Sequence, residues 1–145
     1  MRFLGEQSQT ISQQVLSICG SMDFIDEMET TAAELTAAGW TVFTPQRAEA
    51  GFCWEDLRAA ERIQRKKVYI DAHLANIRGS TAVLIANYRK NDIDGYIGAN
   101  TLMEAAMAYT LGVPVYFLFA IGAQDYQLEA ESVASGVWNG RVQLE

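Results

Sequence analysis

One apolar run in the middle of the chain constrains the fold more than any other feature. Residues 82–86, Ala-Val-Leu-Ile-Ala, contain no polar side chain, and a polar segment follows them from Asn87. A strand that is apolar at every position is buried on both faces, which is typical of central strands in parallel sheets. Because parallel strands need a crossover between them, usually a helix, we expect the flanking sequence to alternate strands and helices.

Three further short runs have the composition of buried strands. The first two end at turn-forming residues, Gly20 and Pro45, which is typical of a strand that leaves the sheet. The predicted strands lie at residues 15–19, 40–44 and 115–119.

Helical patterns separate these runs. Apolar residues within 25–35 share one helix face behind an acidic start, which suits the positive end of the helix dipole. Residues 54–77 predict one long helix or two short ones, and residues 101–111 predict a helix that a following glycine and proline end. The tail predicts a short helix around Glu129 and a short strand near Val142.

Strands and helices in this order form βαβ units. We therefore predict an α/β fold: a Rossmann-like (flavodoxin-like) three-layer sandwich with a central parallel sheet of about four to five strands, which binds ligands at the carboxyl ends of its strands. With 145 residues the chain fits one domain, 1–145. Within it, the Gln/Ser-rich residues 1–14 form an N-terminal arm or an oligomer contact.

Charge and apolar content exclude several partners. The 18 acidic and 11 basic residues give a net charge of −7, which disfavours DNA or RNA because nucleic-acid binding depends on basic patches. A single small phosphate remains compatible, since backbone N–H groups can bind it. No apolar stretch has the length of a membrane span, and the start lacks the residue order of a signal peptide. We therefore expect a cytoplasmic protein with no membrane partner.

The two cysteines, Cys19 and Cys53, have no paired spacing and no accompanying histidine cluster. A zinc site or a disulfide framework needs more ligands than this. Cys19 lies inside an apolar run, where a thiol is most often a small core residue. The sequence therefore predicts neither a metal site nor a cofactor.

Three segments carry candidate functional residues, and the first is Gly20-Ser21-Met22, directly after the first strand. A small residue permits a tight turn, and the helix that follows presents free N–H groups to an anion. The alternative is a plain turn with Ser21 as the helix N-cap. The sequence leaves both open.

The second segment, residues 96–104, places Glu104 in the first turn of its predicted helix, near the edge where a ligand would bind. A carboxylate there can attack an anomeric carbon or stabilise an oxocarbenium-like centre. The alternative is that Thr101 and Glu104 form a capping box, which needs no ligand.

The third segment is Asp71-Ala72-His73, late in the helix before the central strand. His73 is the single histidine of the chain, and it is either structural or an acid, base or hydrogen-bond donor at the same edge. The basic residues within 62–67 are expected to form a solvated helix face. The three tryptophans are expected in the core or an interface, and not as a platform for a base.

Together these segments resemble the nucleoside 2-deoxyribosyltransferase superfamily, including its 2-deoxynucleoside 5-phosphate N-hydrolase branch. The resemblance runs along most of residues 15–119, and its most specific part is the Glu104 helix followed by Gly-Val-Pro-Val at 112–115. It implies cleavage of the N-glycosidic bond of a nucleoside or nucleotide, with Glu104 as nucleophile. It also places Gly20 and Ser21 beside the sugar or its phosphate, and implies a homodimer or larger homo-oligomer.

Two positions depart from the family's pattern. Ile18 aligns near the position at which the transferases have a tyrosine or phenylalanine. His73 aligns with the aspartate that interacts with the base in the transferases. His73 or the nearby Asp71 is therefore the candidate for assisting the base, and Asp92 and Asp94 are alternative carboxylates. The further substrate-binding candidates are Met22, Asn87, Tyr96, Gly98, Asn100 and Thr101.

The leading hypothesis is an N-glycosidase or deoxyribosyltransferase that acts on a nucleoside or nucleoside 5-monophosphate. One alternative is a nucleotide-binding or sensing module without catalysis, and another is a subunit whose site a partner chain completes. A second resemblance adds an enzymatic alternative: residues 95–98 with Thr101 and Glu104 are similar to the glycine-rich loop of phosphoribohydrolases of the lysine-decarboxylase-like family.

Overall fold

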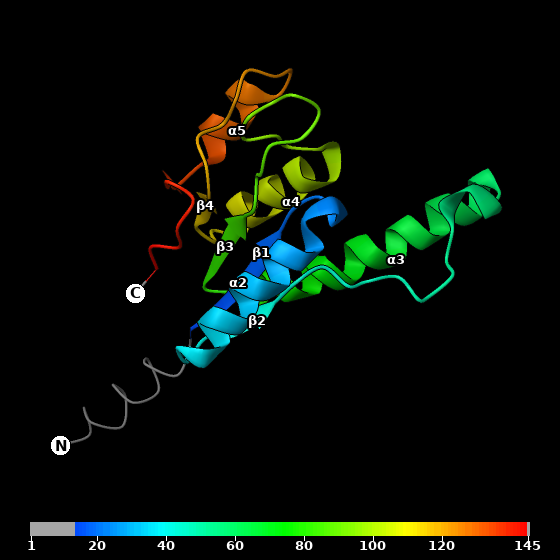
Figure 1. Ribbon diagram of the computed structural model, residues 1–145, viewed down its shortest axis with the longest axis horizontal. Coiled ribbons are helices and arrows are strands. Elements are labelled where there is room, and N and C mark those ends of the chain that lie inside the picture. Colours follow the sequence, from blue (N-terminus) through cyan, green and yellow to red (C-terminus); the bar gives the residue numbers. More distant parts are fainter. Residues whose placement is uncertain (1–13, 145) are drawn as a thin grey trace.

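The computed structural model describes residues 14–144 of the chain (Figure 1). The arm predicted at residues 1–14 therefore lies, except for its last residue, outside the described residues. The strands are β1 (Val15–Cys19), β2 (Thr41–Phe43), β3 (Ala82–Ile85), β4 (Val115–Phe117) and β5 (Gly136–Val137). The helices are α2 (Ile25–Ala37), α3 (Ala59–Arg78), α4 (Ala99–Thr110) and α5 (Gln127–Val133), with 3-10 turns η1 (Met22–Phe24) and η2 (Trp54–Asp56).

All five strands are parallel, and their order in the sheet is β2-β1-β3-β4-β5. This is the flavodoxin-like order, in which the direction of winding reverses between β1 and β3. Leu16 pairs with Ala82 and Cys19 with Ile85, so β1 and β3 end side by side at one edge of the sheet. A ligand of this fold is expected at that edge.

The predicted α/β fold is confirmed. The sheet carries one apolar core on each face, and helices cover both cores, which gives three layers. Alternate residues of β1 point to opposite faces: Leu16 and Ile18 pack with α2, whereas Cys19 packs on the face that carries Ile77 of α3 and Ala105 of α4. Because Cys19 ends its strand on the second face, its thiol points toward α3 and α4.

The observed elements differ from the predicted ones at residues 54–77 and in the C-terminal region. Residues 54–77 form the short turn η2 and then one long helix, α3, whose N-terminal half projects away from the sheet together with the segment that precedes it (Figure 1). The predicted strand near Val142 is wrong: the last strand is β5, and Val142 packs against the core instead. β5 was not predicted because it begins with Gly136, and glycine is uncommon in strands. The strand has a glycine at this position, where a Cβ would lie 3.1 Å from the Tyr116 ring.

Within residues 14–144, no helix combines the length and the apolar character needed to cross a membrane.

Candidate functional site

A pocket of about 200 Å³ opens at the carboxyl ends of β1 and β2, between α3 and α4. Among the lining residues that the structure describes, Glu104 is the one carboxylate and Lys66 the one permanent cation. The lining residues are Gly20, Met22, Thr44, Pro45, Gln46, Ala48, Trp54, Lys66, Tyr69, Ala72, His73, Asn76, Asn100 and Glu104.

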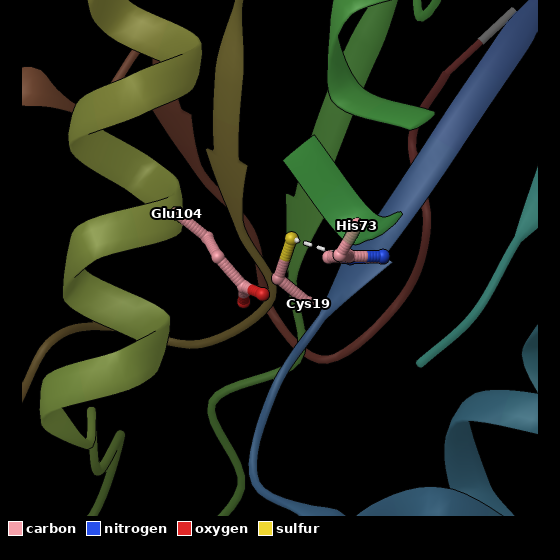
Figure 2. A group of neighbouring side chains, drawn as sticks. All are labelled: Cys19, His73 and Glu104. Atoms are coloured by element: carbon pink, nitrogen blue, oxygen red, sulfur yellow. Dashed lines mark hydrogen bonds between the residues drawn. The ribbon is translucent and has the colours of Figure 1, made fainter. Parts of the chain in front are cut away.

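Three buried side chains from three elements converge at the inner end of this pocket. Cys19 ends β1, His73 comes from α3 and Glu104 from α4, and their side chains point toward one another (Figure 2). The Cys19 Sγ lies 3.3 Å from the His73 Nε2. The sulfur, one ring nitrogen and one carboxylate oxygen all lie within 4.8 Å of one another. We call these three residues the Cys-His-Glu cluster.

Burial controls the ionisation of Glu104, whose residue is only 6 % exposed. The loss of hydration disfavours the carboxylate and raises the pKa of Glu104 from 4.5 to about 7. A hydrogen bond with the Cys19 thiol and the positive charge of Lys66 act in the opposite direction but are weaker. Near neutral pH the carboxyl group is thus balanced between its acid and its nucleophilic form.

His73 and Cys19 are both held in their neutral forms. Burial lowers the pKa of His73 below its ordinary value of 6.5, and a hydrogen bond to the backbone of Ile18 offsets part of this effect. Burial also raises the pKa of the Cys19 thiol well above 9.0, and the neighbouring Glu104 adds to the increase. The cluster therefore has a neutral imidazole, a thiol and one carboxyl group that titrates near pH 7.

The turn after β1 forms the floor of the pocket. A Cβ at Gly20 would lie 3.0 Å from the Ala86 carbonyl oxygen, so β1 and β3 can approach this closely only with glycine there. Ser21 is the N-cap of η1, as the alternative of a plain turn predicted. It accepts a hydrogen bond from the Asp23 N–H at 3.3 Å. Lys90 Nζ donates to the Ser21 Oγ at 2.8 Å and pairs with the Asp23 carboxylate of the same turn at 3.0 Å.

Glu104 does not cap its own helix. α4 begins at Ala99 with Gly98 as its N-cap, so Glu104 lies in the second turn and not, as predicted, in the first. The capping-box alternative for Thr101 and Glu104 is therefore wrong, because Thr101 is already inside the helix. Thr101 is buried and Asn100 lines the pocket.

The alternative carboxylates lie outside the pocket. Asp71 is on the exposed side of α3, where Lys67 Nζ lies 2.7 Å from its Oδ2. Asp92 and Asp94 are exposed and both pair with Arg89, Asp94 at 2.6 Å. None of the three aspartates lines the pocket that contains Glu104.

Three other substrate-binding candidates also lie elsewhere. Asn87 is 1 % exposed, and its amide donates to the Phe119 carbonyl and accepts from the Phe119 N–H, each at 2.9 Å. It therefore ties the end of β3 to the segment after β4. Tyr96 and Gly98 line a separate hollow of about 380 Å³ with Gln124.

Sequence analysis missed most of the polar wall of the pocket. Lys66, Tyr69 and Asn76 line it from α3 together with His73. The four positions follow one another at intervals of three and four residues, which places them on one helix face. This spacing is present in the sequence, whereas the prediction treats the basic residues within 62–67 as one solvated face. Lys66 is exposed, as predicted, and also lines the pocket, to which Trp54 contributes an aromatic side chain.

Comparison with known proteins identifies the fold. No protein-family model matches this sequence, and no curated protein sequence matches it either. The structure is similar to that of a 2-deoxyribosyltransferase from the psychrotolerant bacterium Bacillus psychrosaccharolyticus, with a TM-score of 0.58 and 15% sequence identity. The match covers 86% of this chain and 85% of that one. The chain thus has a nucleoside 2-deoxyribosyltransferase-like fold, as its sequence motifs predicted.

Proposed function

We propose that this protein cleaves the N-glycosidic bond of a nucleoside or nucleoside 5-monophosphate, by hydrolysis or by transfer of the deoxyribosyl group, with Glu104 as the nucleophile. The observation that carries the proposal is the position of Glu104: a buried carboxyl group in a pocket at the switch point of the sheet. The structural neighbour is a 2-deoxyribosyltransferase, which supports chemistry of this class.

In the proposed reaction, the ionised Glu104 attacks the anomeric carbon of the sugar. The C–N bond breaks, its electron pair leaves with the base, and a glycosyl ester forms on Glu104. The base must gain a proton or a strong hydrogen bond as it leaves, since an anionic base is a poor leaving group. The neutral His73 is the candidate hydrogen-bond donor to the leaving base, and a water molecule supplies the proton that the base finally takes. Water then hydrolyses the ester in a hydrolase, or a second base takes the sugar in a transferase.

The remaining lining residues match the parts of a nucleoside. Trp54 and Tyr69 give flat apolar surface for a base. Asn76, Asn100 and Gln46 supply amide donors and acceptors for its polar edge. Gly20 and Met22 line the pocket from the turn after β1, which is proposed to hold the sugar and its 5-position, and Ser21 lies between them in this turn. Lys90 beside Ser21 supports a 5-phosphate at that position.

The proposed assembly is a homodimer or larger homo-oligomer in which a second chain completes the pocket. Ile63 is 72% and Val68 56% exposed on the projecting part of α3. An apolar hollow of about 530 Å³ on this helix shares Trp54 and Lys66 with the pocket. A partner seated there would cover the outer wall of the site. Light scattering tests the assembly directly, and activity per chain that falls on dilution would support a shared site.

A non-catalytic nucleotide-binding module is the second candidate. It is favoured by the aspartates, which lie outside the pocket, and by the neutral state of His73, which leaves no strongly acidic group to protonate a base. A binder would raise its melting temperature with nucleotides and yet release no free base. The glycine-rich loop at residues 95–98, which is similar to that of the phosphoribohydrolases, lines a separate hollow and not the pocket of Glu104. The structure therefore gives the phosphoribohydrolase alternative no support.

The experiment is chromatography of free base after incubation with ribo- and deoxyribonucleosides and their monophosphates. The proposal predicts base release by the wild type and none by Glu104→Ala or Glu104→Gln. Asp71→Asn is the matched control, because this exposed carboxylate lies two residues from His73 and outside the pocket. Full activity in Glu104→Gln would overturn the assignment.

A further inference from the structure

We propose that the Cys-His-Glu cluster binds one divalent transition-metal ion of the zinc class, and that the bound ion switches off the pocket's nucleophile. The metal binding rests on the geometry of Cys19, His73 and Glu104 alone. Only the second part, the inhibition, rests on the proposed function.

The spacing of the donor atoms fits a coordination sphere. With zinc-to-sulfur and zinc-to-nitrogen bonds of about 2.3 and 2.0–2.1 Å, tetrahedral geometry sets the sulfur and nitrogen about 3.6 Å apart. The Cys19 Sγ and His73 Nε2 are 3.3 Å apart, and the Glu104 oxygen lies within 4.8 Å of both. The sulfur and nitrogen thus need to separate by only about 0.3 Å, and the Glu104 carboxylate closes on the ion by turning about its side-chain bonds, by up to about 1 Å.

The donor set selects the class of metal. A thiolate and an imidazole are soft and intermediate ligands, which suit zinc and its neighbours and disfavour Mg²⁺ and Ca²⁺. Metal binding displaces the proton of the Cys19 thiol, and the resulting thiolate and the Glu104 carboxylate together neutralise the charge of a divalent ion. This matters because an uncompensated charge at a buried position is costly. All three residues of the cluster are buried.

The surroundings complete the site. His73 is held through its backbone hydrogen bond with Ile18, the kind of outer contact that fixes the ring of a metal-binding histidine. His73 and Glu104 also line the pocket, so a fourth coordination position would face it and take water or a ligand. Each residue comes from a different element, so the site exists only in the folded chain.

Inhibition follows from the electron pairs of Glu104. An oxygen that donates its lone pair to the metal is not free to attack an anomeric carbon. Zinc bound to the cluster therefore blocks base release, and a chelator restores it.

The test uses the purified 145-residue chain, freed of metal with a chelator and titrated with Co²⁺. The proposal predicts binding of one Co²⁺ per chain, with the charge-transfer absorption of a thiolate bond to cobalt, and displacement of the cobalt by Zn²⁺ but not by Mg²⁺. Cys19→Ser abolishes this absorption, and His73→Gln weakens binding at least about tenfold. Cys53→Ser, which removes the exposed cysteine, leaves both unchanged.

The outcomes separate the two proposals. No thiolate absorption, or absorption that persists in Cys19→Ser and disappears in Cys53→Ser, overturns the metal site. If Cys19→Ser fails to fold, judged by circular dichroism, His73→Gln and Glu104→Gln decide the same question, and undiminished cobalt affinity in both overturns it. Cobalt binding with the predicted variant pattern supports the site even if the protein releases no base, in which case only the proposed function fails.

Discussion

Glu104→Gln is predicted to abolish base release and, at the same time, to stabilise the metal-free fold at alkaline pH. The reason is the burial of the carboxyl group, which raises its pKa from 4.5 to about 7. Each tenfold change in the ionisation equilibrium corresponds to about 1.4 kcal/mol, so the ionised Glu104 costs the folded state about 3 kcal/mol. Glutamine removes this cost because it carries no charge.

The size of the stabilisation by Glu104→Gln depends on pH. At about pH 4 Glu104 is protonated in both the folded and the unfolded chain, so its burial carries no ionisation cost. As the pH rises from 4.5 to about 7, the unfolded chain releases its proton first and the wild type loses stability relative to Glu104→Gln. Above pH 7 the difference stays constant.

Urea denaturation with a chelator present, at about pH 4 and about pH 8, measures this effect. The free energy of unfolding of Glu104→Gln should match that of the wild type within about 1 kcal/mol at pH 4 and exceed it by about 3 kcal/mol at pH 8. Glu34→Gln on the exposed side of α2 is the control, and a surface change of this kind should stay within about 0.5 kcal/mol at both values. A difference between Glu104→Gln and wild type that does not change with pH would refute the reasoning.

Three other variants test the neighbourhood of the site. Gly20→Ala should lower the free energy of unfolding by about 2 kcal/mol in urea denaturation, because its Cβ would press on a backbone carbonyl oxygen 3.0 Å away. Asn87→Ala should cost about 2 kcal/mol, measured in the same way, because it removes two part-buried hydrogen bonds to the backbone of Phe119. An unchanged KM for the nucleoside substrate would confirm that Asn87 is structural. Lys90→Ala should raise KM about tenfold for nucleoside monophosphates and leave KM for nucleosides unaltered, and an equal rise for both would contradict a phosphate role.

Much of the fold could be predicted because strand burial leaves a local signal. The strand at residues 15–19 was predicted with its observed bounds, and the apolar run at 82–86 led directly to the central parallel strand. β5 could not be found in this way. It is only two residues long, and the pairing of Gly136 with Tyr116 depends on a neighbour distant in sequence.

The site was predicted less completely, because its geometry depends on contacts between elements. The convergence of Glu104 and His73 on one pocket agrees with the motifs. Cys19 was assigned to the core, and it is buried, but only its place at the end of β1 brings its thiol to His73. Lys66 shares a helix face with His73, whereas Lys67 pairs with Asp71 on the solvent side, but this spacing points to a pocket only once the position of His73 in the fold is known.

The most direct test of the central claim is to trap the glycosyl ester on Glu104. The protein is mixed with a substrate that the base-release panel identifies, quenched in acid within the first turnover and analysed by peptide mass spectrometry. The account predicts a mass increase of one sugar unit on the peptide that contains Glu104, present in the wild type and in Asp71→Asn and absent from Glu104→Gln. Base release that proceeds with no adduct on that peptide, or with the adduct on another residue, would contradict it.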